Sequence, residues 1–246
     1  MYRFLFLSAF SIFPIIGFAA CNDAPAPQVN WDGCNKEKQN FEKSDLTSAV
    51  LKNTNFNEAI LNKARLGSAD LGSAILTNAS LDGIKAKKAR FVAAQLKNVR
   101  LNKARLNFSN FDRADLTNAT INRSNISDAS FYSTNLSEAN LDNSTFSRSN
   151  FEQAKLVEVS ANAANFSQAI MSHASLEDAN LQGADFSRAK LDNTELSGAD
   201  FSNANLQGAD LHNAEIIDTN FTNAILDNAT WVNRKRCRPG SIGVCK

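Results

Sequence analysis

Large apolar residues recur at every fifth position over most of this sequence. The series begins at Phe41 and reaches Trp231 without an insertion or a deletion. Of its 39 central positions only Ala86 and Ala161 carry a small side chain, and a small residue, most often Ala, usually lies two residues before the centre. A period of five matches neither a helical turn nor a strand, so either element would scatter these side chains over all its faces.

The pattern predicts a chain that bends after every five residues. Each side of such a coil can turn one large and one small side chain inward, and coils can stack through backbone hydrogen bonds at about 4.8 Å. The two small centres support this packing, because Ile84 precedes Ala86 and Val159 precedes Ala161 at the position that is usually Ala. We therefore expect one continuous apolar core whose local volume is conserved.

Two consecutive units show the motif in full: Ala199-Asp200-Phe201-Ser202-Asn203 and Ala204-Asn205-Leu206-Gln207-Gly208. This motif resembles that of the pentapeptide-repeat family, and the resemblance covers about residues 39–233. It implies an all-β fold, a right-handed quadrilateral β-helix solenoid of nearly ten 20-residue coils. The flanking segments resemble those of exported family members, so we expect an N-terminal flank or cap over residues 21–38 and a disulfide-bonded C-terminal cap over residues 234–246.

The first 20 residues are typical of an export signal. Arg3 precedes an apolar run from Phe4 to Phe18, which ends in the small pair Ala19-Ala20. This run is short for a membrane span of about 20 residues and is interrupted by Pro14. We expect residues 1–20 to be a signal peptide, and the mature protein to be periplasmic or secreted, or anchored to the membrane as a lipoprotein.

The four cysteines allow two interpretations of Cys21. The sequence Phe18-Ala19-Ala20-Cys21 resembles a bacterial lipobox, which predicts lipidation of Cys21 and contact with a membrane. The alternative, which we favour, pairs Cys21 with Cys34 and Cys237 with Cys245 as structural disulfides, because a long repeat region without cysteine separates the two couples. A zinc site would need closely spaced Cys pairs or adjacent His, and neither occurs.

Catalytic chemistry finds little support in the sequence. Ser172, Asp192 and His212 are spaced by 20 residues and would stack on successive coils, which places Ser172 and His212 roughly 10 Å apart, too far for hydroxyl activation. An exposed Asp192–His212 pair is the simpler expectation. We predict no catalytic residue, no cofactor and no metal ion, and therefore no enzyme.

Charge divides the chain into two halves, although the net charge is only +1. Between Lys63 and Arg123 there are twelve basic residues against four acidic ones, whereas Asp128 to Asp227 contains fifteen acidic residues against four basic ones. Six residues of the basic half form a candidate patch for an anion or a partner: Arg65, Lys85, Lys87, Lys88, Arg105 and Phe108. A solvated surface is the competing interpretation, and an antiparallel homodimer that joins basic to acidic halves is a third.

The leading functional hypothesis is a non-catalytic, exported, rod-like scaffold that binds a protein or an anionic envelope component. Resemblance to the family suggests an alternative, because some cytoplasmic members mimic DNA and antagonise or protect a type II topoisomerase. The export signal and the basic half argue against that alternative, and we expect no nucleic-acid partner.

Overall fold

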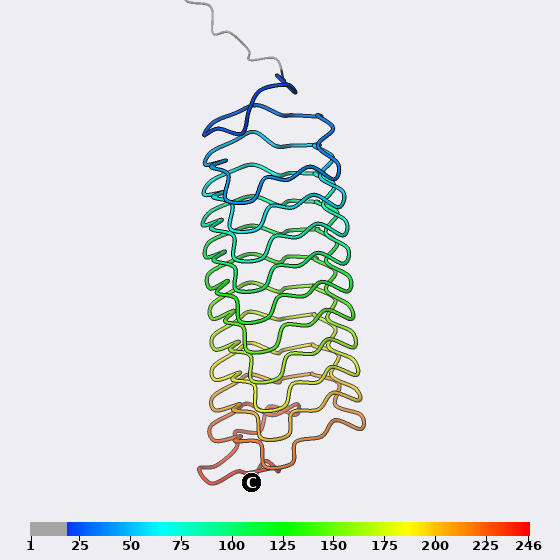
Figure 1. The fold of residues 1–246 in the computed structure, drawn as a ribbon. Helices are drawn as coiled ribbons and strands as arrows, with labels where there is room; N and C mark the ends of the chain where they lie inside the picture. Colours follow the sequence, from blue (N-terminus) through cyan, green and yellow to red (C-terminus); the bar gives the residue numbers. More distant parts are fainter. Residues whose placement is uncertain (1–18) are drawn as a thin grey trace, which may run out of the picture.

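The protein is a right-handed quadrilateral β-helix that forms a single long rod (Figure 1). A computed structural model describes residues 19–246, so most of the predicted signal peptide, residues 1–20, lies outside the described residues. Within these residues there is no helix, and the β structure consists of single-residue bridges rather than longer strands. The parallel bridges begin with Asn30↔Val50 and end with Asp210↔Thr230.

A five-residue unit with one tight turn builds the whole rod. In a representative unit the N–H of Ser44 donates to the carbonyl oxygen of Phe41 (3.0 Å), and Lys43 adopts a φ of 62°. The next coil pairs with it, because Phe41 N–H donates to Ile60 O (2.7 Å) and Ile60 N–H donates to Gln39 O (3.0 Å). A positive φ at the third turn residue bends the chain at each corner, which is why the period is five.

The bridges define four sides, each a column of residues spaced by 20. Side 1 contains the bridges from Asn30 to Thr230, side 2 those from Asn35 to Glu215, side 3 those from Asn40 to Asn220, and side 4 those from Asp45 to Ile225. On each side the bridge residue and the residue after the centre point outward, and the next residue forms the corner. Side chains spaced by 20 residues are therefore neighbours on successive coils.

The interior is a column of aliphatic and aromatic side chains. Phe91, Phe111, Phe131 and Phe151 stack face to face with centroids 4.7, 5.0 and 4.6 Å apart, which measures the rise of one coil. Where a buried hydroxyl replaces the usual Ala, it donates to a carbonyl oxygen, as when Ser124 Oγ donates to Leu101 O (2.7 Å). The core therefore carries little unpaired polarity.

The β-helix begins earlier than the sequence predicts. Residues 21–38 were expected to be a flank, yet Asn30 and Asn35 already form parallel bridges, and Trp31 and Lys36 occupy central positions. The hydrophobicity pattern does not predict these two units, because Lys36 is a charged residue at a central position. Its side chain is only 5% exposed, and its Nζ donates to Cys21 O (2.7 Å) and lies 3.9 Å from the Trp31 ring centroid. Burial lowers the pKa of Lys36, while Asp23 acts in the opposite direction.

Disulfides close both ends of the rod. Cys21 is bonded to Cys34, and Cys237 to Cys245, which are the pairs that the spacing favours. At the C-terminus the chain reverses, so that Ile225↔Ile242 and Thr230↔Arg236 are antiparallel bridges. An antiparallel segment on a parallel edge prevents further coils from adding there.

The stacked Phe column yields a stability prediction. Replacing Phe131 by Ala removes three ring contacts, with Phe111, Phe146 and Phe151, from a close-packed interior. We expect a loss of about 3–5 kcal/mol in the free energy of unfolding. Phe131→Leu places the commonest central residue there and should cost about 1.5 kcal/mol or less. Chemical denaturation followed by circular dichroism measures both values. Equal destabilisation by the two variants would contradict the packing described here.

Candidate functional site

Side 4 brings the predicted basic residues into one straight column. Arg65 bridges to Lys85, and Lys85 bridges to Arg105, so the three side chains project from successive coils at the same position. Lys87 follows the centre of the middle coil and projects from the neighbouring outward column of the same side. The 20-residue spacing in the sequence therefore placed these residues correctly with respect to one another.

These side chains line an open groove of about 380 Å³. Its walls come from four successive coils, because the second outward column contributes one residue from each of them. Gly67 lies in that column, and a Cβ added there would meet only the carbonyl oxygen of Lys87 at 3.9 Å, so the groove is open at this coil. We call this site the basic groove, lined by Thr47, Arg65, Gly67, Lys85, Lys87, Arg105 and Asn107.

Positive charge in the basic groove is largely uncompensated. Arg65 pairs with Asp45 (Nη1–Oδ2 3.4 Å), whereas no residue among 19–246 forms an ion pair with Lys85, Lys87 or Arg105. Stacked like charges at the coil spacing repel each other by roughly 1 kcal/mol in water. Other columns also stack like charges, as Glu195 and Glu215 do on side 2. What distinguishes the column Arg65–Lys85–Arg105 is that it lines a groove, where an external anion can reach its cations.

A carboxylate, Asp45, lies at the N-terminal entrance of the basic groove. Hydrogen bonds from the Thr47 hydroxyl (2.6 Å) and the Thr47 N–H (3.1 Å) lower the pKa of Asp45, and Arg65 adds to this effect. Asp45 is therefore held in its ionised form and neutralises the first cation of the column. The unpaired charges lie further along, on the next two coils.

Lys88 and Phe108 lie at the edge of the basic groove rather than in it. Both are corner residues one coil apart, and the Nζ of Lys87 lies 5.4 Å from the Phe108 ring centroid. Phe108 is 51% exposed and adopts a φ of 61°, a backbone conformation that bulky residues rarely take. An exposed aromatic ring in a strained conformation contributes little to stability and suggests a role in binding.

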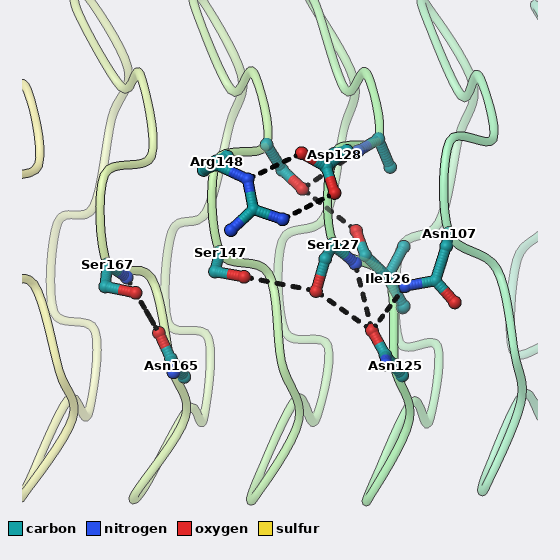
Figure 2. Close-up of polar contacts among 11 residues, drawn as sticks. Asn107, Asn125, Ile126, Ser127, Asp128, Ser147, Arg148, Asn165 and Ser167 are labelled. Carbon is teal, nitrogen blue, oxygen red and sulfur yellow. Dashed lines mark hydrogen bonds and ion pairs between the residues drawn. The ribbon is translucent and has the colours of Figure 1, made fainter.

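Beyond Arg105 the same side continues as a neutral polar ladder. Figure 2 shows Asn107 Nδ2 donating to Asn125 Oδ1 (2.7 Å), which also accepts from Ser127 Oγ (2.9 Å). Ser147 Oγ then donates to Ser127 Oγ (3.1 Å), so the hydroxyl groups of successive coils are linked. The cationic part of side 4 therefore ends at Arg105.

A second, larger groove lies at the corner between sides 3 and 4, and the sequence analysis missed it. Its volume is about 650 Å³, and its charges are mixed, since Lys63, Lys103 and Arg123 alternate with Asp82 and Asp142. Lys63, Gly83, Lys103 and Arg123 are spaced by 20 residues and share one column, and this spacing could have predicted the groove. Asp82 already accepts hydrogen bonds from the Asn102 backbone and side chain and pairs with Arg100.

The acidic half places seven of its fifteen acidic residues on side 2 and at the corner between sides 2 and 3, across the rod from the basic groove. Its carboxylates there and at the adjoining corner form no ion pair with any residue among 19–246: Glu138, Glu158, Glu177, Asp178, Glu195, Glu215 and Asp218. A two-fold antiparallel dimer would bring the same side of each rod together. A dimer formed through side 4 would bring only Asp185 and Asp227 of the acidic half to the partner's side 4, and the seven carboxylates on and beside side 2 would face away.

The residues considered for catalysis do not assemble into a site. Ser172 Oγ donates to Asp192 Oδ1 (2.6 Å), and His212 Nε2 accepts from Arg234 Nε (2.7 Å), so the expected Asp192–His212 pair is absent. Residues 19–246 contain no group of three or more His, Cys, Asp or Glu side chains that could hold a metal ion. Residues 19–246 contain no helix that is long and apolar enough to cross a membrane.

Sequence models of one repeat family match most of the β-helix. The model described as a pentapeptide repeat region matches residues 54–131, and that of pentapeptide repeats in eight copies matches residues 124–160, 162–198 and 194–230. The chain belongs to the pentapeptide-repeat family. A comparison with curated protein sequences finds no match.

Comparison with solved structures finds similar pentapeptide-repeat proteins. HetL, a protein involved in heterocyst differentiation regulation from the cyanobacterium Nostoc sp. strain PCC 7120, is 24% identical and has a TM-score of 0.53 over 85% of this chain and 92% of its own. A trypsin-treated form of QnrB1, a plasmid-mediated fluoroquinolone resistance protein, is 20% identical and has a TM-score of 0.40 over 67% of this chain and 78% of its own. The likeness to HetL shows the fold alone.

The ion pair beside the neutral ladder generates a pH-dependent prediction. Arg148 Nε and Nη2 donate to Asp128 Oδ1 and Oδ2 (2.7 Å each), as Figure 2 shows. The hydrogen bond from Arg148 lowers the pKa of Asp128, so the pair stabilises the fold above the unfolded carboxyl pKa of about 3.9 and is lost as pH falls through the lower folded value.

Arg148→Ala should therefore lower the melting temperature slightly at pH 7 and hardly at all near pH 2, because solvent screens an exposed pair. Arg188→Ala is a matched control, because Arg188 lies in the same corner column and forms no ion pair within residues 19–246. Thermal unfolding at both pH values measures the differences. A penalty at pH 2 equal to that at pH 7 would show that the contact is not ionic.

Proposed function

We propose that this protein is an exported, non-catalytic rod that binds an anionic envelope component or partner protein through the basic groove. The observation that carries this proposal is the column Arg65–Lys85–Arg105, in which the last two cations have no carboxylate partner in the described chain. Charge complementarity of this kind steers and orients a partner. The rigid coils hold the cations in place, so binding needs little ordering of the protein.

A non-catalytic role agrees with the polar contacts outside the groove. Ser172 and His212 are each bound to other partners, and neither is available to activate the other. The alternative, a DNA mimic directed at a type II topoisomerase, requires a continuous acidic surface. Here acidic residues outnumber basic ones in only one half of the rod, and the other half carries the basic groove, so this alternative is disfavoured.

Export to an oxidising compartment is part of the same proposal. Residues 1–20 have the composition of a signal peptide, and both disulfides need such a compartment to persist. The Cys21 sulfur is engaged by Cys34, and a lipid thioether would require the same atom. We therefore place the protein in the periplasm or outside the cell without a lipid anchor.

The intact mass of the mature protein from its native host tests export and anchoring. We expect a chain that begins near Cys21, carries no acyl group and gains four hydrogens on full reduction, because each of two disulfides takes up two. A mass increase that matches acylation of Cys21, together with a single disulfide, would make the protein a membrane-anchored lipoprotein. A retained residue 1–20 segment would contradict export by this signal.

Charge reversal tests the basic groove directly. The double variant Lys85→Glu and Arg105→Glu should weaken co-sedimentation with isolated cell envelopes roughly tenfold and should remove most of its salt dependence. The control is Lys155→Glu with Lys190→Glu, which makes the same change at exposed bridge positions on sides 2 and 1. Equal binding by the two double variants would refute the groove as the binding site.

A further inference from the structure

We propose that the ligand of the basic groove is an extended acidic polysaccharide that lies along the rod axis, with one sugar ring at each coil and its carboxylates at the unpaired cations Lys85, Lys87 and Arg105. This inference rests on the proposed function and specifies the chemical class of the ligand. It follows from the direction of the groove, the spacing of its cations and the groups beside them.

The basic groove runs parallel to the rod. Thr47, Gly67, Lys87 and Asn107 form one wall, and each comes from the next coil along the axis. The opposite wall is the straight cation column, so a ligand that fills the groove must itself be straight over about four coils. A compact anion would contact only one rung of this column.

The spacing of the cations matches a polymer with one charge per sugar ring. Successive coils are 4.7 and 5.0 Å apart where Phe91, Phe111 and Phe131 stack beneath the surface. In an extended 1,4-linked uronate chain each pyranose ring carries one carboxylate, and one ring advances by a length close to one coil. By contrast, phosphates on a strand of duplex DNA advance by about 3.4 Å and wind around the helix axis.

The groups in the groove suit both parts of a uronate ring. Arg105 can bind a carboxylate through two parallel N–H groups, and Lys85 offers a point charge one coil away. Asn107 and Thr47 lie on the opposite wall. The Asn107 amide nitrogen and the Thr47 hydroxyl already donate to Asn125 and Asp45, so Asn107 Oδ1 and Thr47 Oγ1 can accept hydrogen bonds from sugar hydroxyls. The empty position at Gly67 leaves room for a ring.

Phe108 distinguishes a sugar from a simple polyanion. Its ring is exposed at the edge of the groove and lies 5.4 Å from Lys87 Nζ. The C–H face of a pyranose ring can pack on such an aromatic surface, whereas a chain of phosphates has no apolar face to offer. The larger groove at the neighbouring corner is less suitable, because Asp82 and Asp142 would repel carboxylates.

Calorimetric titration of the mature protein with oligomannuronates of two to eight rings tests the proposal. Affinity should rise with each added ring and level off at about four rings, the number of coils that line the groove. Lys85→Glu with Arg105→Glu should lower the affinity roughly tenfold, whereas Lys155→Glu with Lys190→Glu should leave it nearly unchanged. Methyl-esterified oligomers, which lack the charge, should not bind.

A second variant and two other probes separate the outcomes. Phe108→Asn tolerates the positive φ and should weaken oligomannuronate binding about threefold while leaving polyphosphate binding unchanged. Equal affinity for polyphosphate or phosphatidylglycerol vesicles, with the same loss in the charge-reversed variant, would overturn the polysaccharide and keep the groove as an anion site. If no anionic probe responds to charge reversal, the proposed function fails as well.

Discussion

Backbone hydrogen bonds between coils determine where every side chain of this protein lies. The N–H of Phe41 donates to Ile60 O, the N–H of Ile60 donates to Gln39 O, and the same register recurs along the rod. A positive φ at each corner is what bends the chain into this arrangement. Insertion of one residue would turn all later central side chains away from the core. This constraint explains why the five-residue period runs unbroken from Phe41 to Trp231.

The same register arranges the surface in straight columns. Each outward side chain therefore lies beside the side chain 20 residues away, whatever the charge of either. Asp70 and Arg90 form an ion pair on this principle, with Nη1 and Oδ2 3.0 Å apart. The cations of side 4 do the opposite and place like charges on neighbouring coils. The free energy of unfolding of a repeat protein is roughly the sum of the contributions of its coils and of the interfaces between them. A few pairs of like charges on successive coils are therefore tolerated. Binding chemistry can therefore vary on the outside while the core stays uniform.

Much of the candidate site was predictable from sequence because spacing alone defines a column. Arg65, Lys85 and Arg105 were placed together on that ground, and the structure adds that the last two are unpaired. The predicted start of the β-helix, residue 39, was two five-residue units too late. Lys36 occupies a central position, where the repeat pattern predicts an apolar residue. Its amine is satisfied by a carbonyl oxygen and an aromatic ring, and these partners become visible only in three dimensions.

The sequence by itself determined the repeating coil and the identity of most core residues and favoured one pairing of the four cysteines, because each depends on spacing along the chain. Only the tertiary structure decided which outward columns enclose a groove, since that depends on the corner geometry and on the directions of the side chains. It also separated the basic groove on side 4 from the acidic surface on side 2. Distances between residues on different sides of the rod depend on how each coil folds back onto the next, and they cannot be read from residue spacing.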